Sequence, residues 1–147
     1  MLYQSTRGGF SGISSAEAIK MGIAPDGGLF VPEDIIKITP GMIEQIAKSD
    51  YKERAVFLLK LYLTDYTEKE IYESVTSAYN EERFGSDEPA PVYKLNDHTY
   101  ILELWQGPTC AFKYMALQLL PHLMVRAVSK TGETKEIVIL VATSGDT

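Results

Sequence analysis

The chain has 147 residues, of which 45% are hydrophobic and 23% are charged, and its formal net charge at pH 7 is -6. This composition is typical of a soluble globular protein and not of a disordered one. The acidic excess, with no basic stripe, argues against a nucleic-acid-binding surface. No apolar run approaches the roughly 18 residues needed to span a bilayer, and the N-terminus shows no secretory signal pattern. A single cysteine, Cys110, cannot form an internal disulfide, so we expect a cytoplasmic location.

Helix-start signals recur in the first part of the chain. Residues 14–17 (SSAE), 50–53 (DYKE) and 67–70 (TEKE) each fit a capping box, in which the first and fourth residues satisfy each other's backbone N–H groups. Thr39 followed by Pro40 predicts a further helix start, because proline is favoured at the first helical position. Residues up to about 85 are therefore expected to be mainly helical.

Two turn-rich segments interrupt this pattern. Residues 24–28 (APDGG) predict a turn, followed by a short extended segment that ends at Pro32. Residues 86–91 (SDEPAP) are polar and broken by proline, which makes them the best internal boundary. We therefore expect a mainly helical subdomain over residues 1–88 and a second part over residues 89–147.

The second part has the pattern of an α/β domain. Residues 92–95 and 99–104 predict a β-hairpin. A helix is expected from about residue 111 to residue 129, apolar almost all round and therefore buried, with Pro121 kinking it or marking a change of packing partner. Residues 137–141 (IVILV) are an unbroken apolar run, typical of a central parallel strand that is covered on both faces.

Such a strand requires a following helix and further parallel strands, and none follow it in this sequence. We therefore expect the chain to be the N-terminal part of a longer protein. The expected fold class is α/β, with the helical subdomain followed by the start of a parallel-sheet domain that is incomplete.

Lys113 is the unusual residue for chemistry. It falls in the first turn of the expected buried helix, where Ala116, Leu117 and Leu120 share its face. A lysine is usually a solvated surface residue, yet on an apolar face burial favours its neutral amine. A neutral amine is what attack on a carbonyl carbon requires. Residues 107–108 (GP), just before the helix, would let the backbone approach a ligand closely.

Residues 144–147 (SGDT) are the second candidate. A turn of small residues after a buried strand directs backbone N–H groups outward, where they suit a phosphate or a carboxylate. A plain strand-to-helix turn is the alternative. The glycine pattern meets neither the dinucleotide-binding nor the P-loop fingerprint.

Other reactive side chains carry weaker signals. Cys110 is expected to be a small core residue, because no histidine lies near it in sequence. His98 and His122 have no metal-ligand spacing to a partner, so we expect no metal site. Arg7 is a possible anion ligand, although an arginine so near the N-terminus is more often merely exposed.

Residues 103–118 (ELWQGPTCAFKYMALQ) resemble the cofactor-lysine segment of the threonine synthase family. Three further segments match that family in order: residues 5–8 (STRG), 24–32 (APDGGLFVP) and 142–147 (ATSGDT). Four ordered motifs that run from one end of the chain to the other are far more specific than any one of them. The resemblance implies a pyridoxal-phosphate (PLP) enzyme of the tryptophan-synthase-β-like fold (fold type II), of which this chain is about the first third.

The resemblance also implies roles for individual residues. Lys113 matches the lysine that binds PLP covalently. Ser144, Gly145 and Thr147 match the loop that holds the substrate carboxylate, and Asp146 matches its approach to the cofactor. The groups that hold the cofactor phosphate and the pyridine nitrogen are expected beyond Thr147.

Two positions depart from the family pattern. Many relatives have Asp where this chain has Tyr114, and many have His where it has Gln106. The lysine itself is intact, so the expected chemistry survives. These two departures affect the hydrogen bonding around that lysine.

The implied reaction converts O-phospho-L-homoserine and water to L-threonine and phosphate. The partners expected are this small-molecule substrate and the rest of the protein's own chain, with no nucleic acid and no membrane. A related PLP-dependent dehydratase or phospho-lyase is the alternative enzyme. A non-catalytic binding or assembly module is the alternative of another class.

Overall fold

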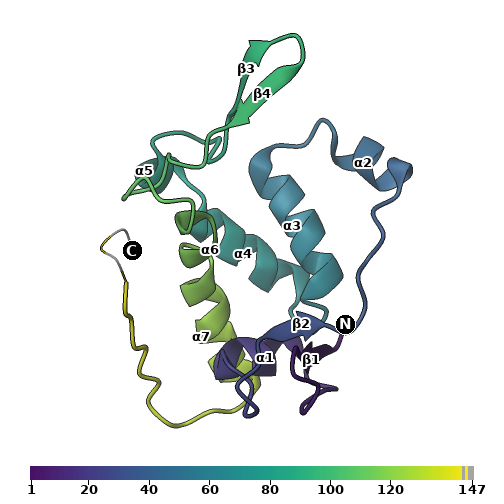
Figure 1. The fold of residues 1–147 in the computed structure, drawn as a ribbon, viewed down its shortest axis with the longest axis vertical. Coiled ribbons are helices and arrows are strands. Elements are labelled where there is room, and N and C mark those ends of the chain that lie inside the picture. The colour runs from purple at the N-terminus through teal and green to yellow at the C-terminus, as the bar shows by residue number, and fades with distance from the viewer. Residues whose placement is uncertain (144, 146–147) are drawn as a thin grey trace.

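The computed structural model describes residues 1–143 and 145, a mixture of helices with two small antiparallel sheets (Figure 1). Within these residues the helices are α1 (Ser15–Met21), α2 (Pro40–Ile46), α3 (Tyr51–Tyr62), α4 (Glu68–Ala78), α5 (Glu81–Phe84), α6 (Tyr114–Leu117) and α7 (Leu120–Lys130). The strands are β1 (Tyr3–Ser5), β2 (Phe30–Pro32), β3 (Val92–Asn96) and β4 (Thr99–Leu102).

The predicted helix starts are confirmed. Helices α1, α3 and α4 each begin with a complete capping box, formed by Ser14 with Glu17, Asp50 with Glu53, and Thr67 with Glu70. Helix α2 begins at Pro40, and the Thr39 side chain accepts the Met42 N–H. These starts depend on residues within one helical turn of each other, which is why the sequence alone predicts them.

The β1–β2 sheet is only partly predicted. The extended segment around Phe30 is confirmed, but no strand signal is present in the sequence at β1. Tyr3 pairs with Pro32 and Ser5 with Phe30 in antiparallel register. A three-residue strand that pairs with a segment more than 20 residues away carries too little local pattern to be recognised.

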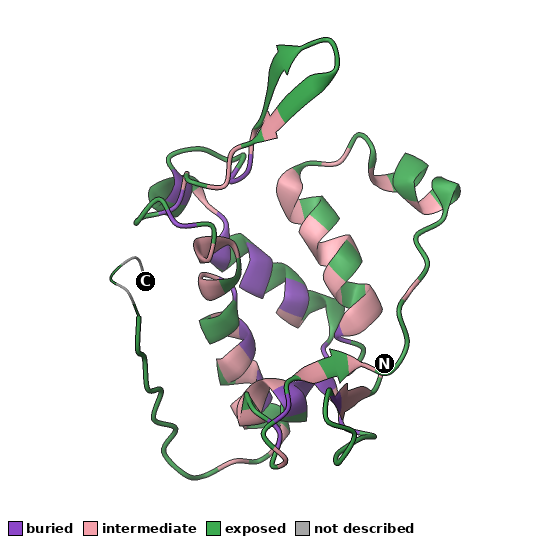
Figure 2. Ribbon diagram, viewed as in Figure 1, coloured by how far each residue is buried: buried purple, intermediate pink, exposed green. Residues whose placement is uncertain are grey.

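The predicted hairpin is confirmed as β3 and β4, which pair antiparallel with a register shift between Lys94 and Asn96. Its turn is fixed by the Asn96 side chain, which accepts the His98 N–H at 3.0 Å. The hairpin projects from the body of the molecule and is exposed along most of its length (Figures 1 and 2).

The single helix expected over residues 111–129 is instead two helices, α6 and α7. The break comes just before Pro121, because proline has no N–H to continue the hydrogen-bond ladder. The Leu119 N–H there donates to the Ala116 carbonyl at 3.1 Å, a tighter turn than an α-helix makes. The predicted effect of Pro121 is therefore confirmed, whereas the continuous helix is wrong.

The core lies between α1, α3, α4 and α7. Helix α4 contributes its buried stripe, Ile71, Val75 and Ala78, and α7 contributes Leu123 and Ala127. Helix α7 packs against both α1 and α4, so residues on either side of the expected boundary at 88–89 share one core. The division into two subdomains stays a prediction.

The expected burial of the apolar C-terminal segments is wrong for the described residues. Leu120 and Val125 are exposed on the outer face of α7. Residues 137–141 form no strand and run along the outside of the molecule, with Leu140 91% exposed (Figures 1 and 2). No described element covers either face of this segment, which is the physical reason it stays unpaired. None of the described helices is long and apolar enough to cross a membrane.

Candidate functional site

Lys113 lies at the N-cap of α6, with a right-handed helical backbone. Its carbonyl accepts the N–H groups of Ala116 at 3.0 Å and of Leu117 at 2.9 Å. The backbone of the candidate lysine is therefore fixed by the one-turn helix that follows it. Its side chain is half-buried.

A groove of about 720 Å³ runs beside Lys113. Its lining residues come from two segments: Phe112, Lys113, Ala116 and Leu117 on one side, and Leu140, Val141, Ala142 and Thr143 on the other. The structure thus brings the candidate lysine next to the chain that leads into the second candidate, residues 144–147.

Of that second candidate only Gly145 lies within the described residues. Its N–H donates to the Thr143 hydroxyl at 3.0 Å, and its φ of +112° is one that favours glycine. Ser144, Asp146 and Thr147 lie outside the described residues.

The apolar face expected around Lys113 is not buried among the described residues. Ala116 is exposed, and Leu120 is 41% exposed. The one-turn length of α6 and the break after it leave this face open to the groove.

Gly107 is needed for packing against the chain's own Tyr114. A Cβ at Gly107 would lie 2.8 Å from the Tyr114 Cβ and 3.5 Å from the Phe84 ring. The expected approach of this backbone to a ligand stays a prediction. The neighbouring Gln106 amide donates to the Glu103 carboxylate at 2.6 Å, so both positions that depart from the family pattern have partners within the chain.

Cys110 is exposed, so its expected place in the core is wrong. It has a positive φ of 57° in the turn before α6, where its N–H donates to the Gly107 carbonyl at 3.0 Å. The turn needs a left-handed residue there, and that conformation keeps the thiol out of the core.

Asp26 joins the first two motifs of the resemblance, a role that sequence reasoning missed. Its carboxylate accepts the Ser5 hydroxyl at 2.7 Å, the Gly28 N–H at 2.9 Å and the Gly9 N–H at 2.9 Å. The Arg7 guanidinium donates to the Asp26 backbone carbonyl at 3.2 Å, so the Arg7 side chain also holds the two segments together. An aspartate before two glycines is a signal for such a turn, but its distant partners are visible only in the fold. None of these residues lines the Lys113 groove.

We expect this Asp26 contact to make the stability of the chain sensitive to acid. The Ser5 hydroxyl, then the backbone N–H groups and Arg7, lower the pKa of Asp26 below its usual 3.8. A lowered pKa in the folded state contributes stability above pH 3.8 that is lost as the pH falls through the folded value. Urea unfolding between pH 6 and pH 2 measures this. Asp26→Asn should flatten the loss below about pH 4, and an unchanged pH profile in that variant would rule out the contribution.

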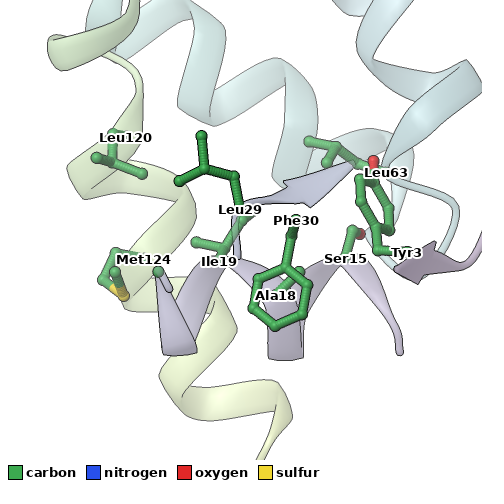
Figure 3. A pocket seen from close by; sticks show the side chains of 10 residues that line it. Tyr3, Ser15, Ala18, Ile19, Leu29, Phe30, Leu63, Leu120 and Met124 are labelled. Atoms are coloured by element: carbon green, nitrogen blue, oxygen red, sulfur yellow. The ribbon is translucent and has the colours of Figure 1, made fainter. Parts of the chain in front are cut away.

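A separate cavity of about 440 Å³ lies between the β1–β2 sheet, α1 and α7 (Figure 3). Its walls are mainly apolar, with Ile19, Phe30 and Met124 among them. Its two hydroxyl groups are already engaged: Tyr3 donates to the Tyr62 carbonyl at 3.1 Å, and Ser15 donates to Asp65. A cavity with no free polar group to orient a ligand is a weaker candidate site than the Lys113 groove. In the described part of the chain no cluster of His, Cys, Asp and Glu could hold a metal ion.

Comparison with known proteins decides the family. The sequence model described as "Threonine synthase N terminus" matches residues 2–79, more than half of the chain. The chain belongs to the threonine synthase family. This confirms the resemblance carried by the four motifs.

Individual relatives of the threonine synthase family agree over a longer range. The chain is 36% identical to threonine synthase from Methylobacillus glycogenes over 100% of its own length and 32% of that protein. It is 41% identical to threonine synthase-like 1 from Mus musculus over 90% of its length and 18% of that protein. The PLP-bound threonine synthase from Brucella melitensis has a similar structure, with a TM-score of 0.81, 31% identity, and coverage of 90% of this chain and 28% of that one. The chain thus spans about a third or less of the relatives that it matches.

Proposed function

We propose that the chain is the lysine-bearing N-terminal third of a PLP-dependent threonine synthase. The reaction proposed is conversion of O-phospho-L-homoserine and water to L-threonine and phosphate. The observation that carries the proposal is the place of Lys113, at the start of α6 and across a groove from residues 140–143, in a chain of this family. The Brucella melitensis relative is described as PLP-bound, which supports the choice of cofactor.

The described residues fit this cofactor. Lys113 supplies the primary amine that a cofactor aldehyde requires. The groove volume, about 720 Å³, lies within the range of small-molecule and cofactor sites. Aliphatic side chains on both sides, Leu117 and Val141 among them, suit an aromatic ring. Bound PLP supplies an electron sink that makes protons on the substrate carbons acidic.

This chain's own residues have two tasks in the proposed reaction. The Lys113 amine holds the cofactor and, when released, moves protons at the α- and β-carbons of the substrate. We assign residues 144–147 to binding of the substrate carboxylate, which backbone N–H and hydroxyl groups of a loop suit, and Asp146 to binding of the cofactor. One lysine serves both tasks because the same neutral amine is nucleophile and base.

The proposed partners are the small-molecule substrate and the rest of the protein's own chain. A cytoplasmic location is proposed because the single cysteine, Cys110, cannot form an internal disulfide, as is usual for proteins of a reducing compartment.

The proposal is tested by identifying the product that the intact protein makes from O-phospho-L-homoserine. We expect threonine and inorganic phosphate in equal amounts, detected by proton and phosphorus NMR. A keto acid in place of threonine would show a dehydratase or phospho-lyase of the same fold. No conversion by protein that is folded and loaded with PLP would favour a binding module.

We expect the 147-residue chain alone to form no threonine. Among the described residues that line the groove, Lys113 is the one cation, so a cofactor phosphate of about two negative charges lacks a cradle there. The open groove also admits water to the lysine. The measurement is threonine formation by the purified chain in the presence of PLP. Turnover equal to that of the intact protein would contradict this expectation.

A further inference from the structure

Tyr79 ends α4 and reaches the segment that carries Lys113. Its hydroxyl donates a hydrogen bond of 2.5 Å to the carbonyl of Met115, which lies 36 residues further along the chain. Met115 is in α6, two residues after Lys113. The last residue of the region matched by the family model is thus in direct contact with the candidate lysine helix.

The Met115 carbonyl needs a donor from outside its own helix. In a continuous α-helix the Leu119 N–H would bond to it. Here the break before Pro121 turns the Leu119 N–H to the Ala116 carbonyl, at 3.1 Å. The Tyr79 hydroxyl therefore takes the place of a bond that the helix break removes.

Tyr79 is itself rigidly held. It is 5% exposed, and its ring packs edge-on against Tyr51 at 5.0 Å between centroids and in a tilted arrangement against Phe84 at 5.9 Å. Burial raises the pKa of the Tyr79 hydroxyl well above its usual value of 10, so it stays a donor over the working pH range. A buried donor in a fixed ring sets the position of its acceptor more narrowly than an exposed one does.

Other contacts join the same two regions. The Arg83 guanidinium donates to the Gln118 side chain at 2.8 Å, one turn after α6 starts. At the other end, the close approach of Gly107 to Tyr114 and Phe84 fixes the turn that precedes the helix. Of these contacts, the Tyr79 bond is the one that a buried side chain makes to the α6 backbone.

We infer that Tyr79 is a positioning residue for Lys113: its hydroxyl fixes the α6 backbone and so aims the lysine into the groove. The inference rests on the proposed role of Lys113 as the cofactor lysine. If Tyr79 has this role, the expected helical subdomain, residues 1–88, helps to shape the Lys113 groove.

The test compares Tyr79→Phe with a matched variant, Tyr66→Phe. The Tyr66 hydroxyl donates to the Leu123 carbonyl at 3.0 Å, also in a buried setting, but on α7 and ten residues beyond Lys113. Both substitutions keep the ring and remove one hydroxyl–carbonyl bond made by a buried tyrosine. A merely structural role predicts the same result for both.

The first readout is amide hydrogen exchange at Ala116 and Leu117, whose N–H groups bond to the Lys113 carbonyl. Tyr79→Phe should speed exchange there by about 3- to 10-fold, the worth of one such bond, while Tyr66→Phe leaves it within about 2-fold. The second readout is the rate at which PLP labels Lys113, fixed by borohydride and mapped to the peptide. Tyr79→Phe should lower that rate by about 3- to 10-fold relative to Tyr66→Phe.

Equal effects of the two variants on either readout would overturn the inference. Tyr51→Leu, which leaves the Tyr79 hydroxyl in place but loosens its ring, is the second variant should Tyr79→Phe fail to fold, and a smaller change in the same direction is expected. Absence of labelling at Lys113 in the unchanged protein would count against the proposed function instead. Hydrogen exchange would still decide whether Tyr79 positions α6.

Discussion

Lys113→Ala is expected to abolish both the covalent attachment of PLP and threonine formation in the intact protein. The substitution removes the amine that the proposal makes the covalent ligand of PLP and the base at the substrate carbons. Activity should fall by at least about 1,000-fold, since both covalent catalysis and proton transfer are lost. The absorption band of the covalently attached cofactor should disappear, while the fold stays, because Lys113 lies outside the core. Steady-state assays, absorption spectra and circular dichroism measure the three effects.

Lys48→Ala is the matched control. Lys48 is exposed and is not among the residues that line the groove, so its loss should leave activity and spectrum unchanged. Retention of most activity in Lys113→Ala would show that another group is the cofactor lysine.

Ile71→Ala lowers the free energy of unfolding by about 2–5 kcal/mol. Ile71 has 0% exposure in α4 and lies in the cluster that joins α4 to α1 and α7. Truncation therefore loses apolar burial and leaves a cavity between packed helices. Ile71→Val should cost only about 0.5–1.5 kcal/mol, because it removes a single methyl group. Urea denaturation followed by circular dichroism measures these differences.

Ile35→Ala provides the surface comparison, since Ile35 is 85% exposed. It should change the unfolding free energy by no more than about 0.5 kcal/mol. If Ile71→Ala cost as little as Ile35→Ala, α4 would not be the centre of the core.

Local signals account for the parts of the fold that the sequence predicts. The capping boxes at Ser14, Asp50 and Thr67 and the turn of the β3–β4 hairpin each depend on residues a few positions apart. The hydrogen bonds that form them lie within a few residues, so the local sequence already contains both partners.

Where a feature depends on a distant partner, the sequence-based prediction is absent or wrong. Strand β1 is visible only through its pairing with β2. The apolar pattern of residues 137–141 is typical of a strand that is covered on both faces. No described element covers this segment. The all-round apolar pattern of α7 likewise overstated its burial, because its outer face meets no described neighbour.

The residues of the candidate site also divide into those with a local sequence signal and those whose role depends on a distant partner. Lys113 and residues 144–147 stand out through residue type and position, and the groove places Lys113 beside the approach to that loop. Tyr79 gives no such signal, because a tyrosine at helical spacing with Ile71 and Val75 is indistinguishable from an ordinary core residue. Its hydroxyl acquires a role only when the fold brings the Met115 carbonyl to it.

Covalent trapping of the cofactor tests directly whether Lys113 is the lysine that binds PLP. The intact protein is incubated with PLP, reduced with borohydride, digested, and the modified residue identified by mass spectrometry. We expect one pyridoxyl group per chain, on Lys113. Labelling at another lysine, or equal labelling of many exposed lysines, would contradict it.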